Sequence, residues 1–325
     1  MRLHLVPQGT TWDFLRLGPA AAGLSAVLMA ASVVLFLFMG LNFGIDFRGG
    51  TTLRTESTQP VDVGAYRAAL TPLGLGDISI TEVFDPGFGP DQNVAMIRIQ
   101  AQEGAEAVTP ETIRAVQGAL RGLDPGMAFP SVESVGPKVS GELIRKAVIA
   151  VTLAIAAVLF YIWLRFEWQF SVGAVAALIH DVTLTIGIFS LLQIQFDLAI
   201  IAALLTIVGY SLNDTVVVFD RVRENLRKYK KTPLKDVLNL SINETLSRTV
   251  MTSVTTLIAL LSLYVLGGDV IRGFVFAMIW GVIVGTYSSV FVASVILLRL
   301  GVKRDWTEGA DGGGPAGTQF GAGPG

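Results

Sequence analysis

Six long apolar runs alternate with polar segments along the chain and predict six membrane-spanning helices. They cover residues 20–39 and, after residue 145, about 147–164, 170–192, 198–219, 250–266 and 273–298. A helix needs roughly 20 residues to cross a bilayer at its rise per residue. The first run is longer than the apolar part of a typical signal peptide, and LNFGIDFRGG after it lacks the small-residue cleavage pattern. We therefore expect an uncleaved first span.

A segment with the pattern of a soluble domain separates the first two runs. Its apolar positions predict a β-α-β-β-α-β order at residues 48–56, 61–70, 78–84, 94–99, 110–123 and 129–135. Thr109 can cap the second helix, Pro110 suits its first position, and Glu111 complements its dipole. This order is that of a ferredoxin-like α+β domain. Gly49 and Gly50 suit a sharp bend out of the membrane better than a phosphate-binding loop.

The composition supports a polytopic α-helical membrane protein rather than a soluble domain. The chain has 325 residues, of which 52% are hydrophobic and 15% charged, and its mean hydropathy is +0.60. A net charge of −2 gives no reason to expect nucleic acid as a partner. The absence of cysteine excludes disulfides and thiol chemistry, and two histidines do not suggest a metal site. We expect no enzyme activity and no bound metal or organic cofactor.

Positive charge is concentrated in the short segments on one side of the predicted bundle. The segment between the fourth and fifth runs is the richest, with Arg221, Arg223, Arg227, Lys228, Lys230, Lys231 and Lys235. The loop at 193–197 on the other side has no Lys or Arg. The positive-inside rule then places both termini in the cytoplasm and the soluble domain outside.

The chain divides accordingly into five parts. We expect a cytoplasmic N-terminus at 1–18, the first helix at 19–40, the extracytoplasmic domain at 41–145, helices two to six at 146–300, and a Gly- and Pro-rich disordered cytoplasmic tail at 301–325.

The fourth run contains an acid in the middle of apolar residues. Asn213 and Asp214 interrupt it, and a carboxylate there costs about 2.5–3.5 kcal/mol on insertion scales. Helical spacing puts Thr206, Tyr210, Asn213, Asp214, Val217 and Arg221 on one polar face, and predicts that Ile207, Val208, Leu212 and Val216 face lipid. Such an acid suggests a proton or ion pathway. The alternative is that Asp214 only hydrogen-bonds a neighbouring helix.

Further polar residues sit in the third, fifth and sixth runs. Arg248 begins the fifth run, and the antiparallel course of runs four and five brings it near Asp214. The two side chains would form a switchable pair, in which Asp214 is ionised with Arg248 close and protonated with Arg248 withdrawn; the alternative is a static salt bridge. His180 and Asp181 could relay protons or only satisfy local hydrogen bonds. Gly281 and Gly285 suggest close helix packing, and Thr286 and Ser289 continue their face.

Several longer motifs resemble those of the SecF family of protein-export membrane subunits. They are LNFGIDFRGGT, VGPKVSGEL, HD, GYSLNDTVVVFDRVREN and SRTVMTSVTTL, and the resemblance covers about residues 20–300. The resemblance implies a six-helix half of an RND-type body in the bacterial cytoplasmic (inner) membrane. It implies pairing with SecD, assistance to the SecYEG translocon on translocating preproteins, and use of the proton motive force. It also implies that Asp214 and Arg248 take part in proton conduction, and membrane lipid surrounds the bundle.

Two other functions remain open from the sequence. The chain could be half of an RND-type exporter of small molecules or lipids, although such exporters carry two six-helix halves in one chain. It could also be a passive scaffold subunit, which would leave Asp214 without a role.

Overall fold

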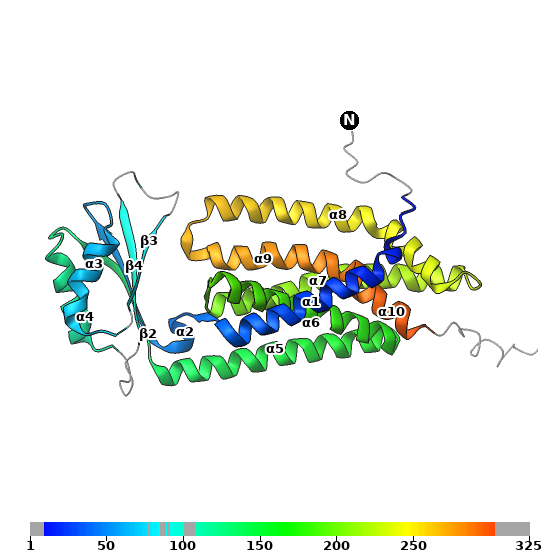
Figure 1. The fold of residues 1–325 in the computed structure, drawn as a ribbon, viewed down its shortest axis with the longest axis horizontal. Helices are drawn as coiled ribbons and strands as arrows, with labels where there is room; N and C mark the ends of the chain where they lie inside the picture. The colour runs from blue at the N-terminus through cyan, green and yellow to red at the C-terminus, as the bar shows by residue number, and fades with distance from the viewer. Residues whose placement is uncertain (1–9, 77, 85–88, 90–91, 101–107, 303–325) are drawn as a thin grey trace, which may run out of the picture.

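A bundle of long helices and an α+β domain at one of its ends make up the structure, a computed structural model (Figure 1). The structure describes residues 10–76, 78–84, 89, 92–100 and 108–302. Within them, six helices are long and apolar enough to cross a membrane, which confirms the predicted number. They are α1 (Gly18–Met39), α5 (Pro137–Arg165), α6 (Trp168–Leu192), α7 (Leu198–Lys228), α8 (Leu234–Leu266) and a last helix made of α9 (Asp269–Ser288), one π-helical turn η3 (Ser289–Ala293) and α10 (Ser294–Leu300).

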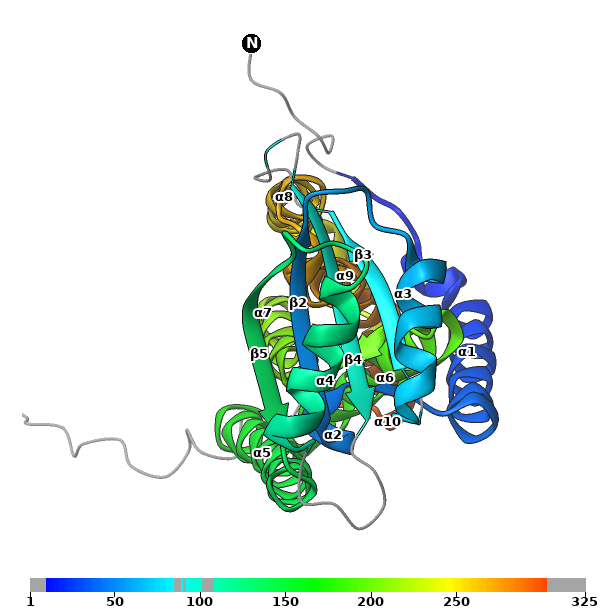
Figure 2. The same ribbon diagram turned by 90° about the vertical axis from the view of Figure 1, so that its left-hand side faces the viewer.

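The α+β domain lies between α1 and α5 and has the predicted ferredoxin-like order. It consists of β2 (Gly50–Ser57), α3 (Val63–Leu70), β3 (Ile78–Val83), β4 (Asn93–Gln100), α4 (Pro110–Arg121) and β5 (Ala128–Val135). The strands form one antiparallel sheet in the order β3-β4-β2-β5. Helices α3 and α4 cover the face that points away from the bundle (Figure 2). Leu53, Leu70, Ile97 and Leu120 form the centre of the core beneath them.

The entry into this domain differs from the sequence-based expectation by a few residues. The first strand begins at Gly50 because Ile45–Arg48 form a short helix, α2. Gly49 and Gly50 follow with φ of 73° and 140°, in the region that favours glycine, and they turn the chain into β2. The predicted segments 1–18 and 301–325 lie partly outside the described residues.

The N-terminal end of α7 is joined to the start of the α+β domain. Strand β1 (Asn42–Phe43) pairs in parallel with β6 (Gln195–Phe196), just before α7 begins. Asp46 accepts a hydrogen bond from Leu198 N at 3.1 Å, and Asp197 accepts one from Ile200 N at 3.1 Å. Burial raises the pKa of Asp197, and burial also lowers the pKa of Arg98 on β4, whose charge acts on Asp197. Both carboxylates therefore cap α7 where the sheet meets the bundle.

The opposite end of the bundle is closed by the N-terminal segment. Residues before α1 form a short 3-10 helix, η1 (Phe14–Arg16), that lies against α8. Asn243 accepts from Trp12 N at 3.0 Å, and Asn239 accepts from Leu15 N at 3.1 Å. These bonds satisfy backbone groups that precede α1 and fix the segment beside the basic α7–α8 connection.

Helix α7 packs closely against α9 at two glycines. A Cβ on Gly281 would overlap the Ile207 side chain, and one on Gly285 would lie 3.2 Å from Ser211 Cβ. Ile207 and Val208 are 1% and 4% exposed, so the expectation that they face lipid is wrong. The missing side chains on α9 let this side of α7 enter the bundle, and the predicted polar face includes the exposed Thr206 and Asn213.

This contact gives a first testable expectation. In Gly281→Ala the added methyl group has no room beside Ile207, and overpacking of this kind costs about 1–3 kcal/mol. We expect a lower unfolding temperature of the protein in detergent. Gly209→Ala is the matched control, because it adds the same methyl group on α7 where nothing lies within 4 Å. Equal stability of the two variants would contradict the proposed close contact.

Candidate functional site

Two carboxylates are buried in the middle of the bundle. Asp181 on α6 is 1% exposed, and Asp214 on α7 is 9% exposed. Buried carboxylates require hydrogen-bond donors, because an unpaired one loses its hydration without compensation. In this bundle the donors are hydroxyl groups and one histidine, contributed by α6, α7, α8 and the last helix.

Asp214 is held by two hydroxyls from neighbouring helices. Thr249 Oγ1 on α8 donates to Asp214 Oδ1 at 2.5 Å, and Ser289 Oγ at the start of η3 donates to Oδ2 at 2.6 Å. Both donors are buried. Neutral hydroxyls donate hydrogen bonds to the ionised carboxylate, and a hydroxyl oxygen can also accept a hydrogen bond from the protonated acid.

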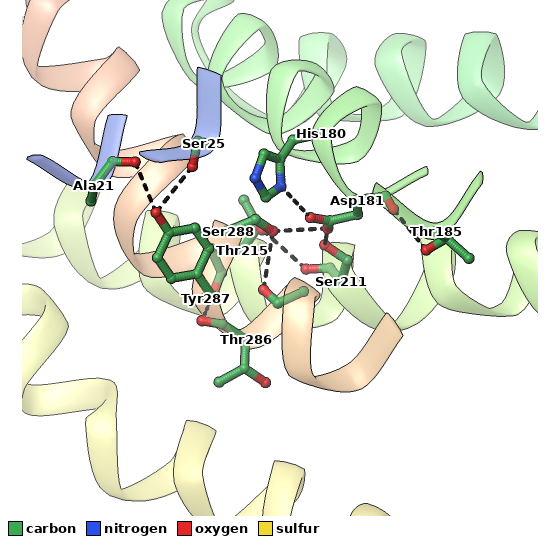
Figure 3. A network of polar contacts seen from close by, with 12 residues as sticks. Ala21, Ser25, His180, Asp181, Thr185, Ser211, Thr215, Thr286, Tyr287 and Ser288 are labelled. Carbon is green, nitrogen blue, oxygen red and sulfur yellow. Dashed lines mark hydrogen bonds and ion pairs between the residues drawn. The ribbon is translucent and has the colours of Figure 1, made fainter. Parts of the chain in front are cut away.

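Asp181 is the centre of a larger network (Figure 3). Its Oδ2 accepts from Ser211 Oγ at 2.6 Å and from Ser288 Oγ at 2.8 Å. Its Oδ1 lies 3.0 Å from His180 Nδ1. Thr185 Oγ1 donates to the backbone carbonyl of Asp181 at 2.8 Å. The network therefore joins α6, α7 and α9 through one carboxylate.

His180 extends this network toward α1. The ring is fully buried, and its centroid lies 5.9 Å from that of Tyr287. Tyr287 Oη donates to the Ala21 carbonyl at 2.9 Å and lies 3.0 Å from Ser25 Oγ (Figure 3). Among the described residues His180 Nε2 has no hydrogen-bond partner. With Nδ1–H donating to Asp181, Nε2 is left as a buried hydrogen-bond acceptor.

Arg248 lies near enough for its charge to act on Asp214, as predicted, but among the described residues no ion pair joins the two side chains. The Arg248 side chain is exposed. The reason is helical geometry: successive residues point about 100° apart, and the adjacent Thr249 is the one that faces Asp214. Asn213 is likewise exposed and points out of the bundle beside Asp214.

Sequence reasoning identified both acids but missed most of their partners. Thr249, Ser211 and Ser288 were not considered, and Ser289 was assigned only to a helix-packing face. One signal was present in the sequence. Thr249, Ser211 and Ser288 each lie within three residues of a residue already named as a candidate, and Ser289 was itself named. The described residues contain no group of three or more His, Cys, Asp or Glu side chains that could hold a metal ion.

A second polar layer lies between the C-terminal part of α7 and the N-terminal part of α8. Arg221 Nε donates to Glu244 Oε2 at 2.7 Å and Arg221 Nη1 to Glu224 Oε2 at 2.6 Å. Asn225, which is buried, donates to the same Glu244 oxygen at 2.6 Å and to Ser241 Oγ at 3.0 Å. These contacts hold the two helices together below the carboxylates.

Comparison with known protein families identifies two matching regions. Residues 115–303 match the model of the protein export membrane protein SecD/SecF, C-terminal, and residues 34–61 match the SecD/SecF GG motif. The latter region contains α2 and the two glycines that turn the chain into β2.

Individual relatives agree with the family models. The protein translocase subunit SecF of Cereibacter sphaeroides is 66% identical over 98% of both chains. The SecF subunit of Rhodobacter capsulatus is 61% identical over 94% of this chain and 93% of that protein.

Solved structures of larger proteins also resemble this chain. A crystal structure of SecDF from Thermus thermophilus, a translocon-associated membrane protein, is 35% identical with a TM-score of 0.79 over 90% of this chain and 39% of that one. A crystal structure of SecDF in a super-membrane-facing form gives a TM-score of 0.69, over 92% and 40%. This multi-pass membrane protein therefore belongs to the SecF branch of the SecD/SecF family of protein-export membrane proteins.

Proposed function

We propose that this chain assists protein export across the bacterial cytoplasmic membrane by binding and releasing protons at Asp214, with Asp181 and His180 as further proton sites. The observation that carries the proposal is the burial of two carboxylates whose partners are hydroxyls and a histidine. Such partners can satisfy both the ionised and the protonated acid. Protons are then the coupling ion, and neither an enzymatic reaction nor a cofactor is required.

The neighbouring Arg248 supplies the second state of this site. Thr249 and Arg248 are adjacent on α8, so a rotation of α8 by about one residue would exchange the hydroxyl for the guanidinium beside Asp214. A cation beside Asp214 favours the ionised acid, and withdrawal of the cation favours the protonated acid. Coupling this exchange to access from opposite sides would draw on about 2.3 kcal/mol per charge per 100 mV of membrane potential.

The exposed side of α7 and α8 supports a membrane partner. Asn213 and Arg248 are exposed at the level of the buried acid, where lipid cannot satisfy an amide or a guanidinium. The chain matches about 40% of the SecDF chains, which contain a longer polypeptide around the matching part. We propose that SecD covers this side of the bundle. The complex would act on preproteins emerging from the SecYEG translocon, with lipid around the remaining helices.

The proposed orientation follows from the charge distribution and the shape of the fold. The α+β domain and the basic α7–α8 connection lie at opposite ends of the bundle (Figure 1). We propose that both termini and this connection are cytoplasmic, since cytoplasmic loops are enriched in Lys and Arg. The α+β domain is then extracytoplasmic.

Asp214→Asn tests the proton site. The amide preserves the size of the side chain but cannot bind and release a proton, so we expect it to remove the stimulation of export by an imposed proton gradient. Arg248→Met should also remove it, because Asp214 would then lose the cation that favours its ionised form. The measurement is precursor translocation into sealed vesicles at matched subunit levels, with and without the gradient.

Asp220→Asn is the matched control for this experiment. Asp220 also lies on α7, but it is half-exposed and forms an ion pair with Arg165 at 3.2 Å, a type of contact that contributes little. Its variant should respond to the gradient normally. A full response of Asp214→Asn would exclude Asp214 as the proton site. Unchanged export combined with altered drug or lipid efflux would favour the exporter function instead.

Single cysteines test the orientation, because the natural chain has none. Glu111 on α4 and Lys231 between α7 and α8 are both exposed. In intact cells a membrane-impermeant maleimide should label Glu111→Cys and reach Lys231→Cys only after the membrane is opened. Labelling of both from the same side would contradict the proposed topology.

A bulky substitution tests the partner surface. We expect Asn213→Trp to reduce the amount of SecD that co-purifies in mild detergent, because the ring projects from the exposed side of α7. Val148→Trp on α5 is the control, since Val148 is 60% exposed and its apolar side chain suits contact with lipid. Equal recovery of SecD with both variants would place the interface elsewhere.

A further inference from the structure

We infer that Ser288 and Ser289 are a paired hydroxyl switch that couples the protonation of Asp181 to that of Asp214. Each serine donates to its carboxylate when that group is ionised and turns to a carbonyl of its own helix when the group is protonated. The inference rests on the proposed proton-driven function and adds two positioning residues to it.

Each of the two hydroxyls has two acceptors within reach. Ser288 Oγ lies 2.8 Å from Asp181 Oδ2 and 3.2 Å from the Gly285 carbonyl. Ser289 Oγ lies 2.6 Å from Asp214 Oδ2 and 3.1 Å from the Thr286 carbonyl. A serine hydroxyl carries one proton, so a full hydrogen bond to one acceptor weakens the bond to the other.

The two acceptors correspond to the two protonation states of the acid. An ionised carboxylate only accepts, and the serine donates to it. A protonated carboxyl can donate a hydrogen bond to the serine oxygen, while the serine hydroxyl donates to the carbonyl three residues earlier. No buried donor loses its partner in either state, so protonation avoids the cost of an unsatisfied buried group.

The other hydroxyls at the two carboxylates lack this second acceptor. Thr249 Oγ1 donates to Asp214 and Ser211 Oγ to Asp181, and among the described residues neither has a second acceptor within hydrogen-bond distance. These two therefore stabilise the ionised acid, whereas the serines on the last helix fit both states. Each carboxylate therefore has one donor that only supports its ionised form and one that can switch: Thr249 and Ser289 at Asp214, and Ser211 and Ser288 at Asp181.

The two serines are consecutive, and this connects the two acids. Ser288 ends α9 and Ser289 begins the π-helical turn η3, a geometry that is rare and often found at functional sites. Ser288 faces α6 while Ser289 faces α7. Because one short segment holds both hydroxyls, a shift that favours donation at one acid changes the position of the other serine.

The remaining titratable groups on the packed helices are few. Those within four residues of the two acids and their hydroxyl partners are His180 on α6, Tyr210 on α7, Arg248 on α8 and Tyr287 on α9, and α1 has none. His180 contacts Asp181 directly, so its charge acts on the same carboxylate as Ser288. The switch therefore works between one acid that has a histidine beside it and one acid that Arg248 can approach.

Precursor translocation into sealed vesicles under a proton gradient tests the switch. We compare Ser288→Ala, Ser289→Ala, the double variant and Thr249→Val, at matched subunit levels. Ser289→Ala should lower the gradient-dependent part of translocation about tenfold, because it removes the donor to the ionised acid together with the acceptor for the protonated acid. Thr249→Val removes a donor from the same acid and should lower it clearly less. The double variant should be no worse than the stronger single one, because both serines act on one step.

Two further measurements distinguish a switch from a structural role. Ser289→Cys keeps the approximate size with a weaker donor and should give an intermediate response. The recovery of SecD with Ser289→Ala should be unchanged, whereas the infrared band of the protonated Asp214 carboxyl should change in Ser289→Ala and be absent in Asp214→Asn.

Several outcomes would overturn the inference. Equal losses in Ser289→Ala and Thr249→Val would reduce Ser289 to an ordinary donor, and additive losses in the double variant would show independent acids. If Asp214→Asn abolishes the response while both serine variants respond normally, the switch is wrong and the proposed function stands. If Asp214→Asn itself responds normally, the proposed function fails.

Discussion

The central constraint in this structure is that two carboxylates are buried in an apolar bundle, and among the described residues neither forms an ion pair with a Lys or Arg side chain. Each must be satisfied by hydrogen bonds from neutral groups, and these come from four different elements. The positions of α6, α7, α8 and α9 relative to one another are therefore fixed by a small number of hydroxyl contacts as well as by apolar packing. Small residues make this possible, because Gly281 and Gly285 bring α9 close enough to α7 for its serines to reach both acids.

The architecture was predictable because it depends on signals that are local in the sequence. Apolar runs of sufficient length define the six helices, and the β-α-β-β-α-β order follows from the alternation of apolar residues and from Thr109 and Pro110 at the start of α4. Asp214 and Asp181 were also identifiable, because an acid within an apolar run is unusual whatever surrounds it.

The surroundings of the acids were not predictable from the same signals. Hydrophobicity does not distinguish a helix side that faces lipid from one that faces another helix, so Ile207 and Val208 were assigned to the wrong environment. The direct contact to Asp214 comes from Thr249 rather than from Arg248, because one residue along a helix turns a side chain by about 100°. Thr249 and Ser288 are ordinary residues of a membrane helix, and only the three-dimensional packing reveals which hydroxyls meet a carboxylate.

The capped N-terminal end of α7 has a mechanical consequence. Asp46 and Asp197 fix this end beside the α+β domain, and Asp214 follows 16 residues after Leu198, the first residue of the helix. At the rise of an α-helix this separation is about 24 Å. A straight helix behaves as a lever, and a tilt of about 5° at the capped end displaces the far residue by about 2 Å, more than a hydrogen bond tolerates. A small rotation of the α+β domain would thereby be amplified into the making or breaking of a hydrogen bond at Asp214.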